Sequence, residues 1–486
     1  MKKRILAAAL AALMLLPLAS CATGDDPADT PANTTSAETG AEGETDFFPA
    51  IPKKDYDGAE FRMIGWTEPG DWYYADGYEN TENKTSILNN TIYEMNTLVE
   101  EHLNIEMSYQ TVKVVTGHEV FDTVYPQIMS GDDPYQLCTL HAYYDYPSFI
   151  TGNCALDFYE LESPDYDQPY WNREVMDMLS IDDHAYIGLS DLCQYSFYMI
   201  YCNKDLLKDA NMKVPYDQVR NGEWTFDLFF NMTTGLYSDN GDGTRNDKDM
   251  YGFASQWDGE GNAFLQAADI YVAKRNEDDE FELTLFSDRF VEMYDKLYAW
   301  SRDESVLCWN FHSPEYTVDF KKNQSYFTCS SLGTRYLDAE FGVGILPLPK
   351  YEKSQASYNH VNWGNNMIVP SSIRNKDMVG DVLELMSFYS STLVLNKYYD
   401  EVLQLRVSEA PDDRDMVELI YDTVVFDPGI AFLDGNSGLA NLVYITCFGI
   451  RENNANIASY YQKNYRAAEK GLNNLIRKVQ RNNSKS

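Results

Sequence analysis

Aromatic rings beside carboxylates are the residues of this sequence that most suggest chemistry. They recur where predicted strands end, as in Trp66-Thr67-Glu68 and in Trp257-Asp258. In open α/β sheets, ligands sit beyond the carboxyl ends of the strands. Sugars present C–H faces that stack on aromatic rings and hydroxyls that bond to polar side chains, so these residues predict a site for a sugar-like ligand. The alternative for each ring is ordinary core packing.

The predicted ligand site draws on two parts of the chain. We expect the first group to consist of Trp66, Trp72, Tyr143 and Trp363, and the group that faces it to consist of Trp257 and Ser331. The carboxylates that accept hydrogen bonds from the ligand hydroxyls are expected to be Glu68, Asp191 and Asp258.

A second motif has the spacing of a twelve-residue calcium loop, from Ser238 to Asp249. Oxygen-bearing side chains fall at the loop positions that ligate calcium, with Gly243 at the turn position. These candidate ligands are Asn240, Asp242, Thr244, Asn246 and Asp249. Ser238 stands where Asp is usual, and Asp249 is shorter than the usual Glu. The loop predicts a structural calcium ion, and the alternative is a tight Asx/Gly turn. We expect no other cofactor.

Catalytic motifs are absent from the sequence. His118-Glu119 is followed by Asp122 where a zincin helix needs its second His. Neither a G-x-S-x-G elbow, nor a Walker loop, nor a G-x-G-x-x-G loop occurs. We therefore expect a protein that is not an enzyme. The alternative is a secreted, lipid-anchored glycoside hydrolase, which needs only two carboxylates about 5 to 9 Å apart among the 76 acidic residues.

Alternating strand and helix patterns must position these residues. Early in the folded part, apolar periodicity predicts strands at 60–66, 105–115 and 135–140 and helices at 86–102 and 119–129. Such alternation indicates βαβ units and a mainly parallel sheet. The pattern resumes later in the chain, with strands at 185–189, 198–202, 251–254 and 325–329, an apolar crossing strand at 341–349, and a long helix at 453–479. The sequence thus predicts two α/β lobes joined by crossing strands.

The amino terminus carries a targeting signal. Lys2, Lys3 and Arg4 precede an apolar run of 15 residues, which is shorter than the roughly 20 that a membrane span needs. The motif that ends in Cys21 resembles a bacterial lipobox, in which the Cys is acylated after cleavage. We expect residues 1–20 to be a lipoprotein signal peptide and residues 21–52 a flexible acidic tether. The folded part is then expected at the extracellular face of the membrane.

The charge of the chain limits its partners. With 38 basic and 76 acidic residues, the formal net charge is −38, so nucleic-acid binding is disfavoured. The last 36 residues invert this balance, with eight cationic side chains and two acidic ones. We expect a solvated helix there, with a membrane-binding or partner-binding patch as the alternative. Seven Cys remain besides Cys21, and we expect free thiols, with Cys193–Cys202 or Cys138–Cys154 bridges as alternatives.

Several motifs occur in the order found in one known family. They are the lipobox, the Asn203-Lys204-Asp205 motif after an apolar strand, the segment 222–227, Tyr251-Gly252-Phe253, and the segment 344–351. In these the chain resembles the extracellular solute-binding lipoproteins (family 1) of bacterial ABC sugar importers. Cys202 departs from the pattern, since an apolar residue or Tyr is commoner there.

The resemblance implies a two-lobed, type 2 periplasmic-binding-protein-like fold with a hinge between the lobes. It places lobe 1 at 53–163 and 345–410, and lobe 2 at 164–344 and 411–486. It also implies a monomer that captures a carbohydrate, an oligosaccharide, between its lobes and delivers it to the membrane subunits of an ABC importer.

Overall fold

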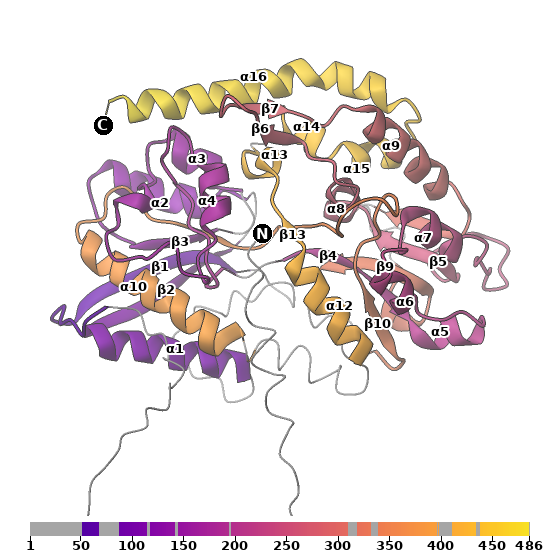
Figure 1. The fold of residues 1–486 in the computed structure, drawn as a ribbon, viewed down its shortest axis with the longest axis horizontal. Helices are drawn as coiled ribbons and strands as arrows, with labels where there is room; N and C mark the ends of the chain where they lie inside the picture. Colours follow the sequence, from indigo (N-terminus) through magenta and orange to yellow (C-terminus); the bar gives the residue numbers. More distant parts are fainter. Residues whose placement is uncertain are drawn as a thin grey trace, which may run out of the picture. The chain divides into compact units, whose positions relative to one another are not determined.

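The computed structural model of the chain describes residues 51–67, 87–113, 117–140, 144–193, 196–309, 318–331, 339–395, 397, 411–433 and 438–485. Within these ranges the α/β class predicted from the sequence is confirmed. Two separate main sheets form, each with its own set of helices. Figure 1 shows their strands and helices.

The first sheet has four strands: β1 (Ala59–Thr67), β2 (Ile105–Lys113), β3 (Leu137–Leu140) and β12 (Asn366–Ile368). Their order is β12-β3-β1-β2, with β2 and β3 parallel to β1 and β12 antiparallel to β3. The carboxyl ends of β1, β2 and β3 therefore meet at one edge, and the chain enters β12 at that same edge.

The helices of this part of the chain owe their positions to apolar faces and caps. In α1 (Ile87–Leu103), Ile92, Met95 and Val99 recur at helical spacing and are buried, as predicted. In α10 (Lys376–Tyr389), the Asn375 side chain caps the first turn by accepting from Met378 N–H. The remaining helical segments are α2 (Glu119–Met129), α3 (Tyr146–Thr151), η3 (Phe158–Glu160), α4 (Arg173–Leu179) and the π-helical η7 (Ser390–Val394).

The second sheet has five strands: β4 (Tyr198–Asn203), β5 (Tyr251–Gln256), β8 (Val306–Trp309), β9 (Ser325–Ser331) and β10 (Val343–Leu346). Their order is β10-β4-β9-β5-β8. The β5 strand is parallel to β8 and β9, whereas β4 is antiparallel to β9 and β10. The sheet is therefore mixed, while the prediction was of a mainly parallel one.

Side-chain caps fix where two helices around the second sheet begin. Asn203 accepts hydrogen bonds from the first turn of α5 (Lys204–Asp209), and Thr225 caps α7 (Phe226–Thr233). The other helices are α6 (Tyr216–Arg220), α8 (Gly259–Ala267), α9 (Asp288–Ser301), η5 (Phe320–Lys322), α12 (Pro411–Asp422), α14 (Ala440–Val443) and α15 (Ile445–Arg451). A small antiparallel pair, β6 (Ala273–Arg275) and β7 (Phe281–Leu283), completes this part.

Three chain segments pass between the two sheets and bond to one another. Ser196, just before β4, donates its N–H to Asn362 Oδ1 at 3.1 Å and accepts from Trp363 N–H at 2.7 Å. Asn362 N–H donates to Val425 O at 2.9 Å. The last contact extends the parallel pair of β11 (His360–Val361) and β13 (Val424–Val425), which α13 (Pro428–Ala431) follows. We call Ser196, Asn362, Trp363 and Val425 the crossover.

A buried histidine fixes the start of the crossover. His360 is fully buried, and burial lowers its pKa to about 3, so the ring is neutral. Its Nε2 accepts from Leu348 N–H at 3.0 Å and its Nδ1 lies 2.9 Å from Thr423 Oγ1. A neutral ring can donate from one nitrogen and accept at the other, so both contacts are satisfied at once.

Strand pairing divides the chain differently from the predicted lobe boundaries at 163/164 and 344/345. Gly188 pairs with Met367 of β12, so the chain still bonds to the first sheet at that point. The segment 341–349 was predicted to cross between the lobes, but its strand β10 pairs with β4 in the second sheet. The chain passes between the sheets only after this segment, at the crossover. The boundaries of the lobes as moving bodies stay a prediction.

The long carboxyl-terminal helix α16 (Ile457–Asn483) contacts both parts of the fold (Figure 1). Near its start the Tyr461 ring stacks on Phe286, with ring centroids 4.5 Å apart. At its end Asn483 Oδ1 accepts from Tyr186 OH at 2.5 Å. No helix in the described part of the chain has the length and apolar character needed to cross a bilayer.

None of the cysteines in the described residues forms a disulfide. All seven besides Cys21 lie in the described residues and carry free thiols, and six of them are buried. The expectation of free thiols holds here, and the two alternative bridges do not form.

Candidate functional site

The ends of β1 and β3 bring two aromatic rings together. Trp66 lies near the end of β1 and Tyr144 follows β3, with ring centroids 5.6 Å apart and planes tilted by 31°. Gly117 (φ +92°) lies against both, because a Cβ there would be 3.2 Å from the Tyr144 ring and 3.6 Å from the Trp66 ring. A residue without a side chain is therefore needed where the chain passes these rings.

The aromatic contacts continue to the crossover. A side-chain hydrogen bond joins Tyr144 to Tyr444, and burial first, then the neighbouring Tyr144, raise the pKa of Tyr444. The Tyr444 ring lies 6.3 Å from the Trp363 ring and 6.0 Å from the Phe448 ring. We call Trp66, Tyr144, Tyr444 and Trp363 the aromatic run. It connects the edge of the first sheet to the crossover.

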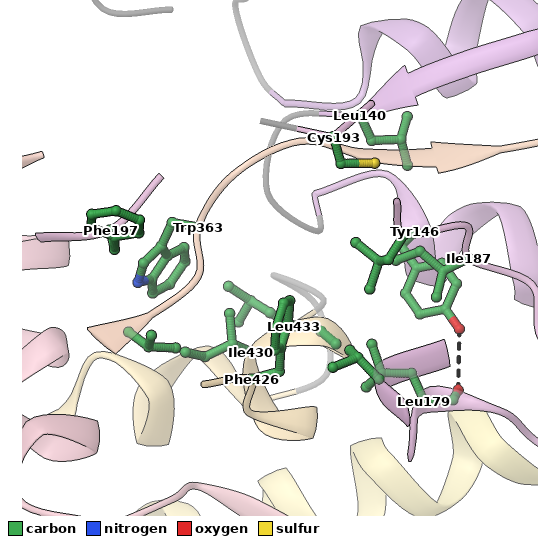
Figure 2. Packing of buried hydrophobic residues seen from close by; sticks show 14 of the residues in the cluster. Leu140, Tyr146, Leu179, Ile187, Cys193, Phe197, Trp363, Phe426, Ile430 and Leu433 are labelled. Atoms are coloured by element: carbon green, nitrogen blue, oxygen red, sulfur yellow. Dashed lines mark hydrogen bonds between the residues drawn. The ribbon is translucent and has the colours of Figure 1, made fainter. Parts of the chain in front are cut away.

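The crossover holds two buried hydrogen-bond donors without acceptors. Among the described residues, Trp363 Nε1 and Asn362 Nδ2 have no hydrogen-bond partner. Trp363 is 8% exposed and Asn362 is 1% exposed. Figure 2 shows Trp363 beside Phe197, with Phe426, Ile430 and Leu433 drawn in the same apolar cluster. Leaving a buried donor unpaired costs about 1–3 kcal/mol, and such donors are candidates for binding an acceptor group of a ligand.

A charged pair lies at the corresponding edge of the second sheet. Asp258 follows β5, and its Oδ1 accepts from Arg451 Nη1 of α15 at 2.9 Å, with both side chains about one quarter exposed. The Cys447 thiol donates to the Asp258 backbone O, so Asp258 packs against α15, the helix that begins directly after Tyr444 of the aromatic run. Ser331 ends β9 opposite Tyr198 at the start of β4. Asp258 and Ser331 therefore share one edge of this sheet.

Trp257, the neighbour of Asp258, is fully buried. Its ring lies 5.4 Å from Phe264, 6.2 Å from Trp300 and 6.3 Å from Phe253. The side chain therefore packs inside an aromatic cluster under α8. This placement favours the core-packing alternative for Trp257 over stacking on a ligand.

The structure says less about the other predicted site residues. Asp191 follows the segment that pairs with β12, and its backbone carbonyl accepts from Ser390 Oγ at 2.6 Å. Glu68, Trp72 and Tyr143 lie outside the described residues. For the site as a whole, the assignment stays a prediction.

A buried carboxylate lies next to the aromatic run. Asp145 follows Tyr144 and is inaccessible to solvent, and burial raises its pKa to about 7. Phe121 N–H donates to its Oδ2 at 3.1 Å, and His118 Nδ1 lies 3.3 Å from Oδ1. Both contacts favour the charged form and partly oppose the effect of burial. They also hold Asp145, the neighbour of Tyr144, at the start of α2.

The calcium-like loop is held by its own hydrogen bonds. Asp249 accepts from Asn240 N–H at 3.0 Å and from Asn246 N–H at 2.8 Å, and Tyr237 OH donates to it at 2.8 Å. Burial alone would raise the pKa of Asp249, but these bonds lower it overall. Asp242 accepts from Thr244 N–H. The carboxylates thus point to backbone N–H groups, as in Asx turns, and in the described chain no group of three acidic, His or Cys side chains converges on a metal position.

The sequence pattern predicts calcium at Asn240–Asp249, whereas the hydrogen bonds of the loop favour the Asx/Gly-turn alternative, and metal removal distinguishes the two. Since N–H donors already satisfy the Asp249 and Asp242 oxygens, we expect the melting temperature to be the same with and without a chelator. A lower melting temperature in chelator, restored by added calcium, would show that an ion completes the loop.

No protein-family model and no curated protein matches the chain. Solved structures do match over most of its length. An ABC substrate-binding protein of Listeria monocytogenes in complex with cycloalternan is 17% identical, with a TM-score of 0.54, covering 88% of this chain and 100% of that one.

Two further structures agree. The maltose/maltodextrin-binding domain of Bdellovibrio bacteriovorus bound to maltotriose is 13% identical, with a TM-score of 0.55, covering 86% of this chain and 100% of its own. The GacH receptor of Streptomyces glaucescens, solved unliganded and with acarbose, is 14% identical, with a TM-score of 0.54, covering 85% and 99%. The chain has the fold of the ABC solute-binding proteins. The two-lobed fold predicted from the sequence is therefore confirmed.

Sequence reasoning missed several residues that the fold brings to this region. Tyr444, Phe448 and Arg451 come from the carboxyl-terminal part of the chain, more than 180 residues after Asp258 in the case of Arg451. No strand ends directly before them, so the strand-end rule could not select them. Tyr144 was within reach of that rule, because it directly follows Tyr143.

Proposed function

We propose that the chain is a lipid-anchored extracellular solute-binding protein that captures an oligosaccharide and delivers it to an ABC importer. The observation that carries the proposal is the aromatic run in a chain with the fold of ABC solute-binding proteins. The matched structures from Listeria, Bdellovibrio and Streptomyces were solved with cycloalternan, maltotriose and acarbose, and such ligands present both C–H faces and hydroxyls.

The aromatic run and its polar neighbours supply what such a ligand requires. Trp66 and Trp363 give apolar faces for the sugar rings. Asp258 is an acceptor for hydroxyls, and Trp363 Nε1 and Asn362 Nδ2 are donors for hydroxyl or ring oxygens. Binding that satisfies a buried donor recovers the free energy that its unpaired state costs.

The crossover is where a hinge would act. The three segments that pass between the sheets meet at Ser196, Asn362 and Val425 through a few hydrogen bonds. A ligand that contacts both sheet edges favours the closed arrangement, because some of those contacts exist only there. The importer would then recognise the closed arrangement of the two lobes.

A panel of oligosaccharides tests capture. We expect at least one member to raise the melting temperature of the purified protein, and chromatography to show that sugar unchanged after incubation. The physical reason is that a ligand bound only by the folded state stabilises it. Enzyme-dependent release of fragments would instead support a glycoside hydrolase, and no shift with any sugar would contradict carbohydrate capture.

Anchoring rests on the motif at Cys21, and a substitution tests it. We expect wild-type protein in the membrane fraction and Cys21→Ser in the medium, because the variant lacks the thiol that would be acylated. Wild-type protein free in the medium would contradict the anchor and leave sugar binding unaffected.

A further inference from the structure

A stripe of seven cations runs along the exposed face of α16 and just past its end. All seven side chains are exposed: Lys463, Arg466, Lys470, Arg477, Lys478, Arg481 and Lys485. Their spacings of one, three, four and seven residues place them on one side of a helix with 3.6 residues per turn. We call these seven residues the basic stripe. It extends over about 33 Å at 1.5 Å per residue.

The opposite side of α16 fixes the direction in which the stripe points. Its buried residues are Ile457, Tyr461, Ala468, Leu472, Leu475 and Val479. These side chains pack on the protein, so the basic stripe lies on the outer side of the helix. Figure 1 shows α16 as a single long helix that α14 and β7 adjoin, in agreement with its contacts.

The stripe is not neutralised by the protein itself. Among the described residues, no carboxylate forms an ion pair with any of its seven cations. The single acidic residue of α16, Glu469, accepts from Tyr465 OH at 2.5 Å and lies to one side of the stripe. This concentration of positive charge occurs in a chain whose net charge is −38. A helix that only needed solubility would require no such segregation by sign.

We propose that the basic stripe rests on the anionic phospholipid surface of the membrane to which the chain is anchored. The proposal depends on the anchoring part of the proposed function. Charges beyond about 8 Å are screened at physiological ionic strength, so the stripe is attracted although the whole protein is acidic. The acidic remainder is repelled and turns away, which gives the protein one orientation.

A bilayer surface fits this stripe better than an inserted contact does. The outward side of α16 between Lys463 and Lys485 carries only small or polar residues among the cations, such as Ala467 and Asn474. A helix that enters the acyl region needs large apolar side chains on the membrane side. The contact is therefore superficial and electrostatic, and it should weaken as salt is raised.

Vesicle flotation with two matched variants tests the proposal. The full-length chain carrying Cys21→Ser is mixed with vesicles of phosphatidylglycerol and phosphatidylcholine, or of phosphatidylcholine alone. Each basic residue near an anionic surface contributes about fivefold to partitioning, so Lys470→Glu with Lys478→Glu should weaken binding to the anionic vesicles by about thirtyfold or more. Lys208→Glu with Lys213→Glu makes the same charge change at exposed sites elsewhere and should bind as the parent chain does.

The remaining outcomes overturn the proposal. Equal binding by the two variants, no binding of the parent chain at low salt, or equal binding to uncharged vesicles would each do so. If the stripe variant bound vesicles normally but lost coupling to the importer, the stripe would be a protein-binding surface instead. Sugar affinity, measured on the same variants, should be unchanged, and its absence in the parent chain would count against the proposed function alone.

Discussion

Replacing Trp363 by Ala should weaken oligosaccharide binding by about ten- to a hundredfold. Pairing the buried Trp363 Nε1–H with an oxygen of the ligand recovers about 1–3 kcal/mol, which corresponds to that change in affinity. Trp363 is well placed for the role, because it joins the aromatic run to the crossover and has an unpaired Nε1 among the described residues. Calorimetric titration of the folded variant measures the change.

A second buried Trp controls for loss of packing. Trp224 is fully buried and donates its Nε1–H to Pro347 O at 2.8 Å, away from the aromatic run. Trp224→Ala should lower the melting temperature but leave the sugar affinity of the folded molecules unchanged. Equal affinities for Trp363→Ala and the wild type would remove Trp363 from the site.

Trp257→Ala should lower the free energy of unfolding by about 3–5 kcal/mol. The side chain is fully buried in an aromatic cluster, and truncation leaves a cavity that its rigid neighbours Phe264 and Trp300 cannot fill. Chemical denaturation of the ligand-free protein measures the loss.

The variant Trp257→Phe separates packing from the indole N–H. Trp257 Nε1 has no acceptor among the described residues, so Phe removes no hydrogen bond and should cost much less than Ala. An unchanged melting temperature for Trp257→Ala together with weaker sugar binding would instead return Trp257 to the ligand site.

Local patterns predicted much of the fold, because they depend on neighbours in the chain. The helical spacing of Ile92, Met95 and Val99 is of this kind, and it appears in the structure. The antiparallel pairing of β12 with β3, in contrast, joins residues more than 200 positions apart, and no local pattern determines it.

The sequence could predict residues of the candidate site only where they end or follow a strand. Trp66, Asp258 and Ser331 follow or end strands, and the structure places all three at strand ends. Burial separates the neighbours Trp257 and Asp258, and the sequence carries no sign of that difference. The β5 residues from Tyr251 to Ser255 are all buried, so no in–out alternation indicates which of the next two side chains turns inward. Tyr444 and Arg451 reach the site through the packing of α15 against α8, a tertiary contact.

Native mass spectrometry of the protein mixed with an oligosaccharide library tests the central claim most directly. We expect one intact oligosaccharide bound to each chain, since the aromatic run with the crossover provides a single place where rings and hydroxyl partners lie together. Spectra that show only the free protein, or only cleaved sugars, would contradict the proposal that this chain captures an intact oligosaccharide.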